Sequence, residues 1–139
     1  RTTAKGADTA AGTALLDALR LPPVKFEASC SLLDTTKLAV PVPVAEVRAA
    51  LGLKDNAFSG RLSDNDALAI WPLLLSASNA GHTVGDWPTG STPRDAAVLL
   101  QRHFAAPSSS GPRRATPNRT HQGRIRALIA KVVPNPSRI

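Results

Sequence analysis

The sequence predicts a mainly α-helical single domain of about five helices, with one short β-hairpin near residues 24–42 and an extended basic C-terminal arm. Three observations lead to this prediction. Apolar residues recur at helical spacing along most of the chain, one stretch alternates apolar and polar residues, and residues 96–139 contain cations but no carboxylate. The chain has 139 residues, of which 42% are hydrophobic and only 4% aromatic, so its core must consist mainly of aliphatic side chains.

The N-terminal part is predicted to be an arm followed by a helix. Residues 1–9 are small and polar, as in an extended arm. Residues 10–21 have apolar side chains at helical spacing, which predicts a helix with one apolar face: Ala14, Leu15, Ala18 and Leu19. Pro22 and Pro23 end this helix, because proline has no N–H to donate and clashes with the preceding turn.

The predicted hairpin follows directly. Apolar and polar residues alternate over residues 24–32, which indicates a strand with one buried face: Val24, Phe26, Ala28, Cys30 and Leu32. Asp34 to Thr36 form a turn, and residues 37–42 return as an edge strand that tolerates Pro41. On the buried face, Cys30 is expected to act as a small hydrophobe rather than as a nucleophile.

Residues 44–62 resemble a helix-turn-helix motif, in which a glycine sits at the turn between two short helices. Here residues 44–51 form the first helix, Gly52 makes the turn, and Asp55 caps a second helix that ends at Leu62. Arg48 departs from the pattern, because a small residue usually lies there. The resemblance implies possible DNA contacts through Lys54, Asn56 and Arg61; the alternative is a purely structural helix pair.

Two longer helices are expected next. Ser63 and Asp66 have the spacing of a capping box and start a helix over residues 64–80, kinked near Pro72 and ended by Gly81. Residues 81–91 form a loop. A second helix begins at Thr92, with Pro93 in its first turn, and runs to Phe104 or Ala105. The mostly helical domain is therefore assigned to residues 10–105.

Residues 106–139 are predicted to form a basic arm with an amphipathic helix. Pro, Ser, Gly and Arg dominate residues 107–120, as in an extended linker. The helix over residues 122–133 carries four aliphatic residues on one face: Ile125, Leu128, Ile129 and Val132. A helix this short is marginal by itself in water, so its apolar face must be buried. We expect it to dock on another copy or on another protein, which makes the chain a homo-oligomer or part of a larger assembly.

The uneven charge distribution indicates an acidic partner. The chain has a net charge of +7, with nine Lys/Arg against ten Asp/Glu in residues 1–95 but eight Lys/Arg and no carboxylate in residues 96–139. Guanidinium groups match phosphate oxygens in charge and geometry, and Arg outnumbers Lys in this segment. The candidate nucleic-acid contacts are Arg113, Arg114, Arg119, Arg124, Arg126 and Lys131.

The sequence offers little that is typical of an enzyme. His82 and Asp86 share a loop and could form a small acid–base pair, whereas His103 stands beside Arg102 and His121 belongs to the basic arm. The chain has one cysteine and no cluster with the spacing of metal ligands, so no catalytic residue, metal or cofactor is predicted. No apolar run approaches the roughly 20 residues that a membrane span needs, and no membrane partner is expected.

These observations predict a non-catalytic nucleic-acid-binding or packaging protein, located inside the cell or within a virion or nucleoprotein assembly. It would be an assembly subunit, such as a virion coat protein or a ribonucleoprotein component, whose Arg-rich arm contacts the phosphates of RNA or DNA. Two alternatives remain. The chain is a structural subunit of a large complex without nucleic acid, or it is a helix-turn-helix DNA-binding regulator.

Overall fold

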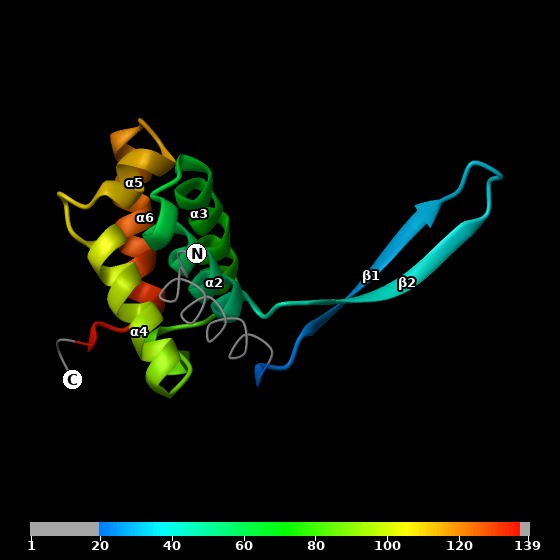
Figure 1. Cartoon of the computed structure of the whole chain (residues 1–139), viewed down its shortest axis with the longest axis horizontal. Coiled ribbons are helices and arrows are strands. Elements are labelled where there is room, and N and C mark those ends of the chain that lie inside the picture. The colour runs from blue at the N-terminus through cyan, green and yellow to red at the C-terminus, as the bar shows by residue number, and fades with distance from the viewer. Residues whose placement is uncertain (1–19, 137–139) are drawn as a thin grey trace, which may run out of the picture.

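The computed structural model describes residues 20–136, which form a helical body and a long β-hairpin (Figure 1). The mainly α-helical fold with one hairpin is confirmed, and the described residues contain five α-helices, α2 to α6. The predicted N-terminal arm, and the predicted helix over residues 10–21 except its last two residues, lie outside the described part.

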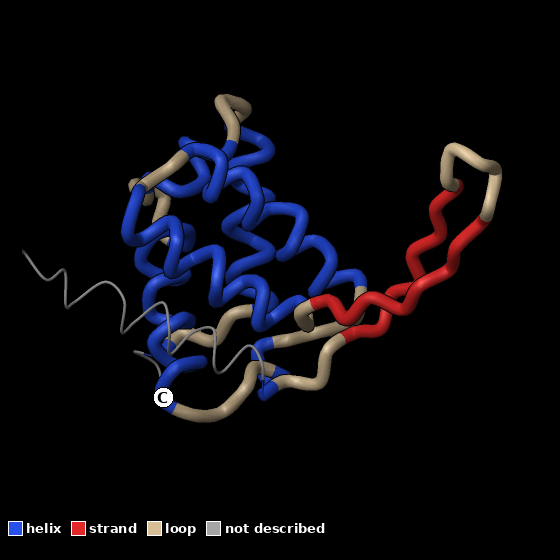
Figure 2. The backbone as a smooth tube through the Cα atoms, turned by 45° about the vertical axis from the view of Figure 1, so that its right-hand side comes forward, coloured by secondary structure: helices blue, strands red, loops and turns tan. Residues whose placement is uncertain are grey.

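The hairpin consists of two antiparallel strands, β1 (Val24–Ser31) and β2 (Lys37–Val44). The predicted burial of one hairpin face is wrong, because the strands point away from the helices and every strand residue except half-buried Ala28 is exposed (Figures 1 and 2). Alternation of apolar and polar residues indicates that one face of a strand is apolar, but it does not indicate whether the rest of the chain covers that face. We call this face the apolar hairpin face, formed by the cross-strand pairs Val24–Val44, Phe26–Val42, Ala28–Val40 and Cys30–Leu38.

Helix α2 (Val47–Arg61) is continuous, so the predicted helix-turn-helix is wrong. Gly52, the expected turn, lies inside this helix. A glycine within a helix costs only about 1 kcal/mol relative to alanine, and packing along 15 residues offsets this cost. Gly52 also allows α2 to lie close to α4, because a Cβ at this position would be 3.5 Å from Ala96 Cβ.

Helix α3 (Asp64–Asn79) follows after Leu62, which adopts a left-handed conformation with φ 50°, and includes Pro72 as expected. The predicted capping box is wrong, because the Ser63 side chain makes no capping bond. Its supposed partner, the Asp66 carboxylate, instead accepts two hydrogen bonds from the Arg61 guanidinium. Two parallel charge-assisted bonds from one guanidinium add energy and geometric specificity that a single carboxylate bond to a backbone N–H does not supply.

The loop after α3 contains a short 3₁₀ turn, η1 (Val84–Asp86). It leads to α4 (Ser91–Leu100), which continues as one π-helical turn, η2 (Gln101–Ala105), to the predicted end. The residue that precedes α4 is Gly90 rather than the expected cap Thr92. Gly90 has φ 124°, a conformation that side chains rarely adopt.

The extended C-terminal arm is not observed. Instead, a short helix, α5 (Ser110–Ala115), and a longer one, α6 (Arg119–Val132), pack on the helical body. Gly111 and Pro112 are buried, so this segment packs on the body although its polar composition is typical of an exposed linker. The apolar stripe of α6 is buried against this chain's own α3, α5 and η2, so the stripe is not free to dock on a second subunit as expected.

One hydrophobic core joins α2 to α6, and no hairpin residue belongs to it. Trp87 is buried at its edge and donates a hydrogen bond from Nε1 to the Pro93 carbonyl at 2.9 Å. Trp71 packs against it from outside. The largest fully buried apolar side chains are Phe58, Phe104, Leu51, Ile70, Leu74, Leu100, Ile125, Ile129, Val132 and Val133.

Candidate nucleic-acid interface and the polar cluster at the hairpin base

The six predicted phosphate contacts all lie on the two C-terminal helices. Arg113 and Arg114 belong to α5, and the other four belong to α6. Five of the six are exposed, and Arg126 is half-buried. The structure therefore brings them to one part of the body, although not on an extended arm.

Three of these cations are held by neutral groups. Arg113 Nη2 donates to the Ser108 carbonyl at 2.8 Å, and Lys131 Nζ donates to Ser78 Oγ at 2.8 Å. Arg126 donates from Nε and Nη2 to the carbonyls of Ala106 and Pro107 at 3.2 and 3.0 Å. Carbonyls and hydroxyls orient these side chains without neutralising them, so the three positive charges remain available to an anion.

Arg114 is the one member of the set with a carboxylate partner in the described part of the chain. Its Nη1 lies 2.9 Å from Asp64 Oδ1, and both side chains are exposed. An exposed pair of this kind contributes at most about 1 kcal/mol. The side chains of Arg119 and Arg124 make no hydrogen bond or ion pair within residues 20–136.

The outer surface of α6 has a regular arrangement. At 100° per residue, Arg119 and Arg126 form one row of cations and Arg124 and Lys131 form a second row, both away from the buried stripe. Between the two rows lie small residues: Gly123, Ala127 and Ala130. A polyanion backbone could therefore approach the helix closely with cations on both sides.

The predicted helix-turn-helix contacts do not form such a surface. Arg61 is bound to Asp66, and Lys54 Nζ lies 4.0 Å from the same carboxylate. Asn56 Nδ2 donates to the carbonyl of Gly52, one turn earlier in α2, at 3.0 Å. These three side chains therefore already interact with other groups of the helical body.

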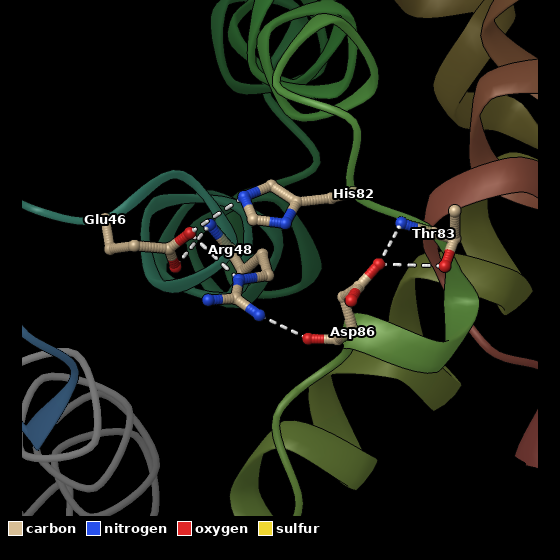
Figure 3. Close-up of polar contacts among 5 residues, drawn as sticks. All are labelled: Glu46, Arg48, His82, Thr83 and Asp86. Atoms are coloured by element: carbon tan, nitrogen blue, oxygen red, sulfur yellow. Dashed lines mark hydrogen bonds and ion pairs between the residues drawn. The ribbon is translucent and has the colours of Figure 1, made fainter.

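A separate polar cluster lies where β2 enters α2 (Figure 3). The Glu46 carboxylate accepts hydrogen bonds from the backbone N and from Nε of Arg48, at 3.0 and 2.9 Å. Arg48 Nη1 also donates to the carbonyl of Asp86, in the loop after α3. His82 Nε2 lies 3.6 Å from Glu46 Oε1. The cluster therefore fastens the hairpin base to the loop between α3 and α4.

The sequence allowed an acid–base pair of His82 and Asp86, but the described contacts of these side chains join them to other residues. The Asp86 carboxylate accepts from Thr83 N and Thr83 Oγ1, both at 2.8 Å, and these hydrogen bonds lower the pKa of Asp86. Sequence reasoning missed Glu46 and Arg48, because their loop partners lie about 36–38 residues away and no local pattern connects them.

Asp55 is buried in α2, whereas the sequence suggested a cap. Both of its carboxyl oxygens and the nearby Ser59 Oγ are buried without a hydrogen-bond partner in the described part. Burial raises the pKa of Asp55 to about 8. Desolvation causes this shift.

The remaining candidate nucleophile and bases also lie apart. Cys30, expected in the core, is exposed on the hairpin. His103 packs edge-on against Phe58 with ring centroids 5.4 Å apart, and desolvation together with the charge of Arg102 lowers its pKa. The His121 ring lies 4.9 Å from that of Trp71.

No group of three or more potential ligands within residues 20–136 could hold a metal ion. In the same range, none of the helices has the length and hydropathy needed to cross a membrane. Comparison with known proteins finds no matching family, no similar curated protein and no similar solved structure.

Proposed function

We propose that this chain is a non-catalytic nucleic-acid-binding subunit of a larger assembly, and that it contacts phosphates through the outer surface of α5 and α6. The observation that carries this proposal is the charge state of that surface. Six cations gather there, and Arg114 is the one that meets a carboxylate within the described part.

The arrangement on α6 supports phosphate as the ligand. Two rows of cations flank small residues, so the backbone of a nucleic acid can approach without displacing a bulky side chain. The side chains of Arg119 and Arg124 have no partner to give up among the described residues, and their binding to phosphates releases the counterions condensed on the nucleic acid. Helix α6 contains no Phe, Tyr or Trp, so binding is driven by the backbone and depends weakly on sequence.

The exposed hairpin supports the second half of the proposal. A chain that acts alone gains nothing from a long apolar projection, which costs solubility. A subunit of an assembly uses such an element to contact its neighbours. The competing function is a structural subunit without nucleic acid, whose cationic surface meets an acidic protein face.

The test compares two double variants that each remove two positive charges. Arg119→Gln with Arg124→Gln changes α6, and Lys25→Gln with Lys37→Gln changes the exposed hairpin. Binding of a fluorescent oligonucleotide, single-stranded and duplex, is measured at several salt concentrations. We expect the α6 variant to flatten the plot of log K against log salt by roughly 0.7–0.9 for each phosphate that it no longer neutralises, while the hairpin variant keeps the wild-type slope.

Two results would overturn the proposal. One is an equal slope in both double variants, which would place the contact elsewhere or make it non-specific. The other is wild-type binding to polyglutamate as tight as to the oligonucleotide, which would favour the acidic protein face.

A further inference from the structure

The hairpin has two chemically different faces. The apolar hairpin face contains eight hydrophobic residues in four cross-strand pairs and no charge. The opposite face carries Lys25, Glu27 and Lys37 together with serines and prolines. Such a division is typical of a sheet with one covered face and one face in water.

The helical body does not cover the apolar hairpin face. Phe26 is 60% exposed, Val24 56% and Val40 50%, and the strands extend away from the helices (Figure 2). The face presents on the order of 500 Å² of apolar surface, which is within the range of the largest apolar patch on a typical monomer, a patch that is often functional. A two-stranded hairpin alone is also marginally stable in water, so a covering layer would stabilise it.

The edge of β2 is unsuited to adding a further strand. Pro41 and Pro43 have no N–H, so β2 cannot donate hydrogen bonds at these two positions to a third strand. These prolines therefore disfavour a partner that extends the sheet at β2, and the apolar residues of the hairpin favour a partner that packs on its face.

The chemistry of the face restricts the partner further. It offers no charge and no hydrogen-bonding side chain apart from the weak Cys30 thiol, so the complementary surface must be apolar and similar in width. A second copy of the same face meets these conditions and is present at the same concentration. Two copies would together bury about 1,000 Å², close to the lower limit for a specific protein interface.

We propose that the apolar hairpin faces of two copies pack against each other, so that two hairpins form a two-layered, four-stranded sandwich around a two-fold axis. The inference names the partner in the assembly half of the proposed function, on which it rests, and does not depend on phosphate binding. The contacts of Glu46 and Arg48 hold the hairpin base, so each body stands at a defined position relative to the sandwich.

The test uses the full chain without nucleic acid and two variants of neighbouring residues in β2. Val40→Lys places a charge on the apolar hairpin face, and Ala39→Lys places the same charge on the opposite face. Sedimentation equilibrium gives the molar mass over a wide range of concentration, and circular dichroism checks that each variant is folded. We expect wild type and Ala39→Lys to dimerise, and Val40→Lys to be at least tenfold weaker in dimerisation.

Cys30 provides a second measurement, because it is the one cysteine of the chain and lies on the apolar hairpin face. Its rate of reaction with a thiol reagent should fall as the wild-type concentration rises, and should stay constant in Val40→Lys. A wild-type chain that remains monomeric would overturn the proposal. So would a thiol protected in the monomer, which would mean that another part of this chain covers the face.

Dimerisation unaffected by Val40→Lys, or weakened equally by Ala39→Lys, would also overturn it. Oligonucleotide binding is measured separately with the α6 variants, so failure of the hairpin contact and failure of phosphate binding give different results.

Discussion

Asp55 is a buried carboxyl without a hydrogen-bond partner among the described residues, and it should make stability depend on pH. The unfolded chain releases this proton near pH 3.8, whereas the folded chain retains it to about pH 8. Between these values the folded state binds the extra proton, so Asp55 lowers the free energy of unfolding as pH rises, by at most about 1.4 kcal/mol per unit.

Replacing Asp55 with Asn removes the titration and nearly conserves shape. We expect the free energy of unfolding of Asp55→Asn, relative to wild type, to increase by at least about 1 kcal/mol from pH 5 to pH 8. Urea denaturation at several pH values measures it, with the exposed Asp95→Asn as the control. A constant difference between Asp55→Asn and wild type across this range would contradict the buried, protonated state.

Two glycines should respond oppositely to alanine. At Gly111, a Cβ would lie 2.5 Å from Phe104 Cε1 and 2.6 Å from the carbonyl oxygen of His103, so Gly111→Ala must displace α5. We expect a loss of about 1–3 kcal/mol in the free energy of unfolding. Gly123 in α6 has nothing within 4 Å, and Gly123→Ala should stabilise by about 0.5–1 kcal/mol through helix propensity. Chemical denaturation measures both changes, and a neutral Gly111→Ala would show that α5 is loosely docked.

At the scale of elements, Arg48 links the hairpin to the body. It connects Glu46, at the end of the hairpin, with the backbone of Asp86 after α3. Arg48→Ala should leave the helical core folded but give the hairpin more freedom. A fluorophore on Cys30 should then lose anisotropy on the nanosecond timescale relative to wild type, measured in the Val40→Lys background to avoid dimerisation. Arg94→Ala, an exposed change on α4, is the control, and equal anisotropy in both variants would show that the cluster does not restrain the hairpin.

The sequence could predict elements whose signal is local. Alternation predicts the first strand of the hairpin, and apolar spacing predicts most of α6. Sequence reasoning fails where tertiary contact decides: Gly52 resembles a turn until the neighbouring Ala96 on α4 explains the need for a small residue. Tertiary contacts also decide which surface covers an apolar stripe. The hairpin face is expected inside and the α6 stripe on a partner, whereas the structure leaves the hairpin face exposed and buries the α6 stripe against this chain's own helices.

The candidate site shows the same limit. The clustering of cations in the last third of the chain is visible in the composition, and the structure places them together on α5 and α6. The partners of the arginines are not visible in the sequence. Arg114 pairs with Asp64, 50 residues earlier in the chain, and Arg61 pairs with Asp66, which has the sequence spacing of a helix-capping residue. The exposure of the hairpin face is not recognisable from the sequence, because alternation is equally typical of a core strand.

On the scale of the whole molecule, body and hairpin should be separable, since the hydrophobic core is built from α2 to α6 without any hairpin residue. Val24 and Val44 are paired across the strands, so their Cα atoms lie about 5 Å apart and a Gly-Ser-Gly linker can replace residues 24–44. We expect this variant to unfold cooperatively with a Tm within about 5 °C of the wild-type value, measured by circular dichroism under conditions where wild type is monomeric. Removing α6 should instead abolish cooperative unfolding, because Ile125, Ile129 and Val132 fill the core. The hairpin-free chain should be monomeric at every concentration and keep the wild-type salt dependence of oligonucleotide binding. Loss of cooperative unfolding on hairpin removal would show that the body depends on the hairpin for its stability.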